Sequence, residues 1–413
     1  MAATPETFEP LYKGRDFYVP AFDIKIQGQD ISKATAKDVL DVRYTDGIDK
    51  IDTMELTINN WDAGTKDFKY TGSRKGGRDA NCQLFEPGQV IELFMGYFKP
   101  LAVRQDHKDK SDPLRLMLAG KIHKLSPSFP ASGQPVLKVS AQSILSQLSS
   151  KQETFHYEPK MFPEEKMQAS LIAKKVSDRG KLKLGNLVVP LETKEGAQHT
   201  EPSLTYVIQK NQFDIVFLLQ LAHRHGYDVV LKYHNEEKRE EPYLFFGPVA
   251  DEPRVSYSLE WGESLIQFQP TLTTSQQVSE VTVRWWDVAQ KKDAKVTVDR
   301  TMLPNSPLRD KKQLAALEEG FKEKKEIIVD KPFTTKKEAE EYAKAQLSGI
   351  AGKMVTAHGS TLGTPDLRAG SRVEILGLGD TFTGTYTVTA STHSIGANGY
   401  ITEFDARLEE KAR

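Results

Sequence analysis

Apolar and polar residues alternate along the last stretch of the chain, which predicts a β-strand with one buried and one solvated face. The apolar positions are Tyr400, Phe404, Ala406 and Leu408, and the polar positions are Glu403, Asp405, Arg407 and Glu409. The stretch before it carries Tyr386, Val388 and Ala390 at every second place. The two stretches therefore predict a C-terminal hairpin.

The number of residues in the turn indicates how the two strands of this hairpin pair, because a shift of one residue moves every side chain to the other face. A two-residue turn would set Val388 opposite Glu409 and mix the buried and solvated faces. A three-residue loop over 397–399 that ends in a left-handed glycine keeps the faces apart. In that register His393 meets Glu403 on the polar face.

Four patterns of the N-terminal part return later in the chain in the same order. The matched pairs are 55–62 with 280–287, 85–93 with 367–375, 118–122 with 382–386, and 135–141 with 400–406. Generic strands and glycine turns resemble each other, so any single match is weak evidence. Four matches in one order favour an internal duplication of a β module, each copy interrupted at different points.

Helical periodicity occurs in four stretches between and within these modules. The stretches are 164–177, 214–224, 314–325 and 335–350. Asn211 or Asp214 is expected to cap the second helix, and Gly226 is expected to end it. Thr335 and Glu338 form a capping box for the fourth helix.

These elements predict an α+β fold that is mainly β. The expected boundaries are 1–142 for the first β module, 143–265 for an α/β insert, 266–300 with 352–413 for the second β module, and 301–351 for a helical insertion. Prolines in the first twenty residues oppose helix and predict an N-terminal arm.

Composition narrows the classes of function. The 413 residues carry a formal net charge of -1, which gives no overall attraction to nucleic acid or to an anionic membrane. The single cysteine, Cys82, excludes an internal disulfide. The N-terminus lacks the features of a signal peptide, and no apolar run is long enough to span a membrane.

No pattern in the sequence predicts a catalytic residue, a cofactor-binding residue or a metal ligand. His223 and His225 are two residues apart, so on a helix they point away from each other. His393 with Glu403 is weighed as an acid and base pair, but a structural pair across two strands is favoured. Cys82 has no histidine close to it in sequence, and no serine sits in a nucleophile elbow.

The loop 62–83 is rich in glycine and basic residues. Its GSRKGG motif lacks the spacing of a phosphate-binding loop, so a solvated hairpin tip is favoured over an anion site. Its role and that of the N-terminal arm are not predicted.

Several of these motifs together resemble the late control protein D family. They are NQFDIVFLLQLAHRHGY at 211–227, LEWGESLIQFQP at 259–270, VTVRWWD at 281–287, LRAGSRVEI at 367–375 and GTYTVTASTHSIGANGYITEF at 384–404. This family supplies the central baseplate hub of contractile phage tails and injection systems, and is similar to the N-terminal hub part of type VI secretion spikes. The resemblance implies two tube-type β-barrels per chain and a homotrimer beneath a hexameric tube.

The resemblance also implies the partners and the location. The chain ends at Arg413 without the added enzymatic or needle modules of fused relatives, so a separate spike protein is expected. Other expected partners are further copies of the chain, the inner tube protein and other baseplate proteins, with neither nucleic acid nor membrane insertion. The expected location is the cytoplasm during assembly and then the baseplate of a phage-tail-like particle.

Two other functions stay open at this point. A carbohydrate-active protein that cleaves cell wall would use an acidic pair such as Glu403 and Asp405, although these lie on the wet face of a strand. A soluble ligand-binding module is the second alternative, and it would not need to trimerise.

Overall fold

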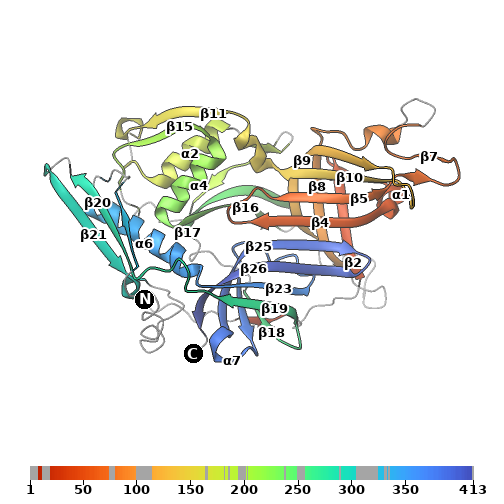
Figure 1. The fold of residues 1–413 in the computed structure, drawn as a ribbon. Helices are drawn as coiled ribbons and strands as arrows, with labels where there is room; N and C mark the ends of the chain where they lie inside the picture. Colours follow the sequence, from red (N-terminus) through yellow and green to blue (C-terminus); the bar gives the residue numbers. More distant parts are fainter. Residues whose placement is uncertain are drawn as a thin grey trace.

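A computed structural model gives the fold of the chain, which is α+β and mainly β, as predicted. The described residues are 8–11, 19–73, 80–98, 114–162, 166–180, 182–184, 187–193, 201, 203–236, 239–248, 256–287, 290–303, 324–329, 333 and 335–411. Most strands belong to one 14-stranded sheet that runs through the molecule (Figure 1).

The N-terminal half of this sheet is a module of six main strands around one apolar core. The strands are β2 (Val19–Ile26), β4 (Val39–Gly47), β5 (Thr53–Asn59), β8 (Val90–Phe98), β9 (Arg115–Ser128) and β10 (Val136–Ser143). They pair in the order β4, β5, β10, β9, β8, β2. Alternating buried residues such as Met54, Leu56 and Ile58 of β5 fill the core.

The C-terminal half repeats this arrangement with six other strands. They are β18 (Ser256–Glu260), β19 (Leu265–Leu272), β23 (Val355–Leu362), β24 (Arg372–Leu376), β25 (Gly384–Gly396) and β26 (Gly399–Lys411). Their pairing order is β19, β23, β26, β25, β24, β18, the same as in the first module. The first strand differs in direction, because β2 is antiparallel to β8 whereas β18 is parallel to β24.

Local details of the two modules also correspond. Gly88 donates its backbone N–H to the carbonyl of Ile122 at 2.7 Å, and Gly370 donates to the carbonyl of Val388 at 2.8 Å. Both glycines have positive φ angles, 93° and 86°, which favour glycine. One residue after each accepting carbonyl, a β-bulge interrupts the pairing of β9 with β10 and of β25 with β26. Ile122 and Val388 therefore occupy equivalent positions.

Three of the four matches between the halves fall on equivalent strands, and the first is wrong. The EVTVRWWD segment is β20 (Glu280–Asp287), which lies outside the large sheet. The counterpart of β5 is β23, which pairs with β26 as β5 pairs with β10. Strand patterns that share one buried face look alike in sequence wherever the strand lies.

The segment expected to belong to the second module as 266–300 is therefore divided. β20 forms a three-stranded sheet with β21 (Lys292–Asp299) and β22 (Lys325–Ile328), and α6 (Lys336–Gly352) packs on it (Figure 1). The expected capping box is present, since Thr335 accepts the Glu338 N–H at 3.1 Å. Residues 314–323 of the helix expected over 314–325 lie outside the described part of the chain, and Lys325 begins a strand.

The α/β insert has its own core of apolar residues. Its elements are β11 (Gln152–Tyr157), α2 (Ala169–Gly180), β12 (Lys183–Leu184), β13 (Leu187–Val188), β14 (Leu191–Glu192), β15 (Val207–Phe213), α4 (Asp214–His225), β16 (Tyr227–Glu236) and β17 (Arg239–Pro248). Gly226 ends α4 in the left-handed conformation, as predicted. Neither Asn211 nor Asp214 caps it, because Phe213 is the N-cap and the Asp214 carboxylate binds Arg179 at 2.5 Å.

The predicted register of the C-terminal hairpin is wrong, and the predicted faces hold for β26 but not for β25 beyond its bulge, where Ser391 and His393 are buried. Gly396 pairs with Gly399 across a two-residue turn, and Gly399 has the expected positive φ. The bulge at Thr389 corrects the parity that a longer loop was expected to correct, so Val388 faces Ala406. Parity alone cannot locate a bulge inside a strand.

Short elements complete the fold. They are β1 (Glu9–Pro10), β3 (Gln29–Asp30), α1 (Lys33–Asp38), β6 (Trp61–Asp62), β7 (Asp67–Phe68) and α7 (Gly379–Phe382). β1 pairs with β18, so this part of the predicted arm lies on the second module. β6 and β7 form a hairpin at the end of the molecule opposite β20 and β21 (Figure 1). Residues 74–79 of the basic loop lie outside the described part.

Candidate functional site

The two modules join along a single strand edge. Residues 384–387 of β25 pair with β24, and residues 390–395 of the same edge pair with β4 of the first module. The other edge of β25 pairs with β26 along its length. β25 thus belongs to both modules and makes their sheets continuous (Figure 1).

Asp46 of β4 lies at the centre of this junction and is 6% exposed. One of its carboxylate oxygens, Oδ1, accepts the backbone N–H of Ser391 at 3.0 Å and the Ser391 hydroxyl at 2.5 Å. The other, Oδ2, accepts the Ala369 N–H at 3.2 Å and lies 3.6 Å from Nε of Arg368. Burial raises the pKa of Asp46, and the Arg368 charge opposes that rise.

Arg368 reaches across from the second module to the first. Its guanidinium donates to the hydroxyl of Tyr44 at 2.6 Å and to the backbone carbonyls of Leu116 and Met117 in β9. It also lies over the Tyr44 ring, 4.9 Å from the centroid. One side chain therefore links β4 and β9 to the loop before β24.

His393 of β25 is fully buried beside this cluster. Its Nε2 lies 3.0 Å from the Ser391 hydroxyl and 3.2 Å from the Leu367 carbonyl, while Nδ1 lies 3.1 Å from Tyr400 Oη and from Thr402 Oγ1. Burial first, and then the charge of Arg368, lower the pKa of His393 to about 3. The imidazole is neutral at pH 7.

Asp52 completes the network at the hydroxyl of Tyr44, which also accepts the hydrogen bond from Arg368. The Tyr44 hydroxyl donates to its carboxylate at 3.2 Å. Burial and the nearby Asp46 carboxylate raise the pKa of Asp52 to about 7. Two buried carboxylates thus share one guanidinium, so a proton at Asp52 lowers the cost of burying both.

The sequence of contacts from Asp46 to Ser391 to His393 is not a nucleophilic triad. The serine hydroxyl bonds the aspartate directly, all three residues are buried, and a histidine with a pKa of about 3 is a poor base at neutral pH. The arrangement can satisfy buried polar groups and hold two sheets in one register. The sequence search missed it, because Asp46 and Ser391 are 345 residues apart.

The two large aromatic residues of β26 serve different cores. Tyr400 belongs to the core of the first module, stacked on Tyr97 at a ring distance of 5.5 Å. Phe404, four residues later on the same face, belongs to the core of the second module beside Phe268. Both are buried, as the alternation predicted, but only Phe404 lies in the module to which the sequence assigned both.

The structure separates the other residues that the sequence analysis considered. His393 does not meet Glu403, because His393 pairs with Thr402 and Glu403 lies 3.9 Å from Arg43 at the surface. Asp405 binds His358 at 2.9 Å, also at the surface.

His223 lies 3.3 Å from Asp49, whereas burial lowers the pKa of His225 to about 4. Cys82 is partly buried. In the described part of the chain, no cluster of three or more His, Cys, Asp or Glu residues has a geometry that could hold a metal ion.

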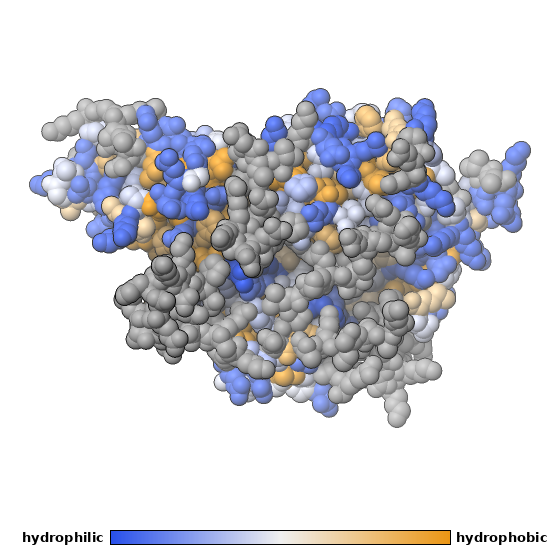
Figure 2. All heavy atoms as spheres, turned by 180° about the vertical axis from the view of Figure 1, so that it is seen from behind, coloured by the Kyte–Doolittle hydropathy of each residue, from blue (hydrophilic) through white to orange (hydrophobic). Residues whose placement is uncertain are grey.

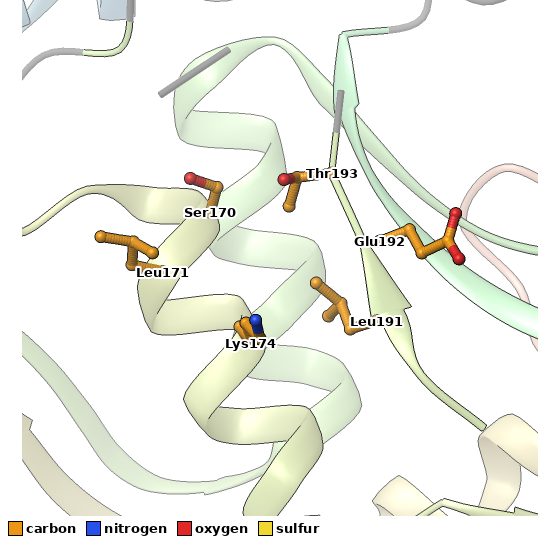
Figure 3. A pocket seen from close by; sticks show the side chains of 6 residues that line it. All are labelled: Ser170, Leu171, Lys174, Leu191, Glu192 and Thr193. Carbon is orange, nitrogen blue, oxygen red and sulfur yellow. The ribbon is translucent and has the colours of Figure 1, made fainter. Parts of the chain in front are cut away.

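A shallow hollow of about 250 Å³ lies between α2 and β14. Its lining residues are Ser170, Leu171, Lys174, Leu191, Glu192 and Thr193. The Glu192 carboxylate points away from α2 (Figure 3), and the Ser170 hydroxyl already donates to Glu201 at 2.9 Å. The polar groups therefore do not converge on a ligand.

Seen from behind, hydrophobic residues form separate groups with hydrophilic ones between them (Figure 2). Among the described helices, none has the length and hydrophobicity needed to cross a membrane.

Solved structures identify the class of fold as that of phage tail proteins. The chain is similar to the 43 kDa tail protein of prophage MuSo2 from Shewanella oneidensis, with a TM-score of 0.61, 14% identity, and coverage of 94% of this chain and 98% of that one. A tail protein of Neisseria meningitidis MC58 also gives 0.61 and 14%, with 94% and 97% covered. A type VI secretion component of Escherichia coli gives 0.53 and 12%, with 94% and 76% covered.

One protein-family model also matches the chain. The model described as the Alg8 N-terminal domain matches residues 186–397, just over half of the chain, and the chain belongs to this family. The matched region runs from the α/β insert through β25. No curated protein matches the chain.

Proposed function

We propose that the chain is the central hub of the baseplate of a contractile tail or injection system, acting as a homotrimeric adapter between a hexameric inner tube and a trimeric spike. The observation that carries this is the duplication, in which two modules with one pairing order form a continuous sheet. Three chains then offer six similar surfaces, which a six-fold partner requires. The tail-protein fold supports the same conclusion.

The junction gives the adapter its rigidity in this proposal. A tube that seats on two modules needs them at a fixed spacing and angle. The six β25–β4 pairs and the Arg368 network tie the modules together through backbone and side chains. Buried polar groups that are satisfied in only one arrangement favour that arrangement over others.

The inserts are assigned to the periphery or to the spike and baseplate side. The α/β insert and the unit of β20, β21 and α6 gather at one end of the molecule (Figure 1). An ion pair of 2.7 Å between Arg224 of α4 and Glu338 of α6 connects them. We accordingly propose a division into a first barrel module, an α/β insert, a β20–α6 insertion and a second barrel module that resumes at β23.

In this proposal the chain is not an enzyme, and a separate spike protein, the tube protein and other baseplate proteins are its partners. A cell-wall-cleaving role is disfavoured, because Glu403 and Asp405 lie at the surface beside Arg43 and His358 rather than in a cleft. Assembly in the cytoplasm, followed by residence in a phage-tail-like particle, follows from the same proposal.

Light scattering tests the oligomeric state and cross-linking tests the adapter role. The expected mass is three chains of 46.4 kDa each, alone or with spike protein added. In the purified particle, tube contacts should map to equivalent surfaces of both modules. Tube contacts confined to the inserts, or a monomer in the presence of spike protein, would refute the adapter.

A further inference from the structure

The large sheet ends on each side in a strand of two residues. β3 pairs with Lys25 and Ile26 of β2, and a two-residue turn joins these two strands. β1 pairs with Tyr257 and Ser258 of β18, although it belongs to the N-terminal arm. The first module therefore covers its outer edge with the next stretch of chain, whereas the second module covers its outer edge with a segment that precedes the first module in sequence.

The arm continues the alternation of buried and exposed residues in β18. β1 runs parallel to β18, so paired residues point to the same face of the sheet. Pro10 pairs with Ser258 and is exposed, whereas the next residue, Leu11, points to the core face as Leu259 does and is 1% exposed. Leu11 and Leu259 belong to one apolar cluster in the second module. One side chain of the arm therefore completes the core of that module.

The arm occupies only part of the edge of β18. All five residues of β18, Ser256–Glu260, pair with β24, but only two of them pair with β1. Among the described strands, β18 has no other partner. Pro10 also lacks an N–H donor, as prolines in edge strands do. A longer extended segment without a proline at that position would form more backbone hydrogen bonds with β18 than the arm forms.

The surface beside this edge is acidic. The adjacent stretches 256–266 and 374–387 hold β18, the turn after it and the turn between β24 and β25, and they contain no Lys, Arg or His. Their acidic residues are Glu260, Glu263, Glu374 and Asp380. Glu260 is exposed at the end of β18, beyond the two residues that pair with β1. This surface attracts basic residues of any segment that continues along the edge.

We propose that the outer edge of β18 is a docking site for an extended segment of a partner protein, and that the arm occupies this site until the partner replaces it. The partner segment runs parallel to β18, places a leucine-sized apolar side chain where Leu11 lies, and carries basic residues after it. Strand addition of this kind gains affinity from backbone hydrogen bonds and specificity from alternate side chains. The proposal goes beyond the hub function and holds whether or not the chain trimerises.

The arm has a physical role before the partner arrives. An uncovered edge strand offers unpaired N–H and C=O groups to other chains, which promotes aggregation. Without Leu11, the core of the second module would also lose a packed side chain beside Leu259. A strand of two residues prevents both, and its two backbone pairs are few enough for a longer segment to displace.

A disulfide that fixes the arm tests this exchange. Pro10 and Ser258 are paired neighbours on one face, so Pro10→Cys with Ser258→Cys, in a Cys82→Ser background, should form a disulfide. The probe is a fluorescein-labelled peptide of residues 5–15, PETFEPLYKGR, whose binding is followed by fluorescence anisotropy. The reduced protein should bind this peptide. The oxidised protein should bind it about tenfold more weakly or not at all, because the tethered arm cannot leave.

Two altered peptides test the chemistry of the site. One carries Leu11→Asp, which removes the apolar side chain, and the other carries Lys13→Glu with Arg15→Glu, which reverses the basic charges. Each should bind the reduced protein about tenfold more weakly than the original peptide. Added salt should shrink the effect of the charge reversal and leave the effect of Leu11→Asp unchanged, because salt screens only the charged contacts.

The substitution Leu11→Asp in the full chain releases the arm without new cysteines. This variant should bind the original peptide about tenfold more tightly than the unmodified chain does. Melting temperatures show which proteins are folded. Equal binding by the reduced and oxidised proteins, or no binding by the folded Leu11→Asp variant, overturns the docking site. Equal affinities of the original and charge-reversed peptides overturn the basic partner segment, and light scattering on the unmodified chain tests the hub function separately.

Discussion

The two modules share one pairing order but accept extra chain at different places. In the first module residues 48–52 connect β4 to β5, whereas residues 273–354 separate β19 from β23 in the second. Conversely, the first module carries the β6–β7 hairpin between β5 and β8, where the second has only residues 363–371. Long surface connections cost little loop entropy, so the shared sheet survives insertion at either point.

The comparison also separates what holds a module together from what joins the modules. Each module has its own apolar core, and both contribute to a buried polar network at the junction. Cores tolerate any side chain of similar size and apolarity, whereas a network of charges tolerates few changes. Variants at the two kinds of position should therefore behave differently.

The largest effects are expected at Tyr400 and Phe404. Replacing either with alanine should lower the free energy of unfolding by about 3–5 kcal/mol, because each leaves a cavity in a packed core. Hydrogen exchange should show Tyr400→Ala loosening β5 and β10, and Phe404→Ala loosening β23 and β24. Glu403→Ala, at the surface between them, is the control and should change little; equal exchange patterns for both core variants would contradict the division into two cores.

A loss of about 3 kcal/mol is expected for Arg368→Met. Removal of one partner from a buried ionic cluster leaves Asp46 uncompensated, even though methionine fills much of the space. Denaturant unfolding provides the measurement. Arg43→Met, on the exposed face of β4, should change the free energy by less than about 1 kcal/mol. Similar losses for the two arginines would show that the network does not stabilise the junction.

The pH dependence of stability should expose the two titrating groups of the junction. The pKa of Asp52 is raised to about 7 by folding, so its contribution is present below pH 4 and is lost as the pH rises through 7. The pKa of His393 is lowered to about 3, so its contribution is present above pH 6.5 and is lost on acidification. These slopes oppose each other between pH 4 and 6.5.

Asp52→Asn removes the contribution of Asp52 to the pH dependence of stability. Its melting temperature relative to the unmodified protein should rise from pH 5 to about 7 and then level off, and its own stability should fall on acidification. The surface variant Asp405→Asn serves as a control, since it lies outside the network. A melting-temperature difference for Asp52→Asn that does not change with pH would contradict the raised pKa.

The smallest effect is expected at the paired glycines of the two modules. Gly88→Ala and Gly370→Ala should each cost about 1–2 kcal/mol, because both positions have positive φ. Thermal unfolding of the two single variants measures the costs. If the modules are equivalent here, the two costs should agree within about 0.5 kcal/mol and should add in the double variant; a large disagreement would weaken the structural correspondence.

The sequence alone predicted the class of fold, the buried face of β26 and the existence of a duplication. Period-two alternation from Tyr400 to Leu408, the capping box at Thr335 and the terminating Gly226 are local signals, and the structure confirms all three. Each depends on residues within a few places of one another, where backbone geometry dictates the side-chain direction.

Only the tertiary structure decided which strand is the counterpart of β5, where the bulge of β25 lies, and which residues meet at the junction. These facts depend on partners that are distant in the chain, such as Asp46 with Ser391 and Arg368 with Tyr44. From the sequence alone, a polar residue is assigned to a solvated face, even where a partner from another module buries it. His393 was therefore placed on a wet face, although it is fully buried. Alternation specifies that a strand has two faces, but the neighbouring strands determine what each face contacts.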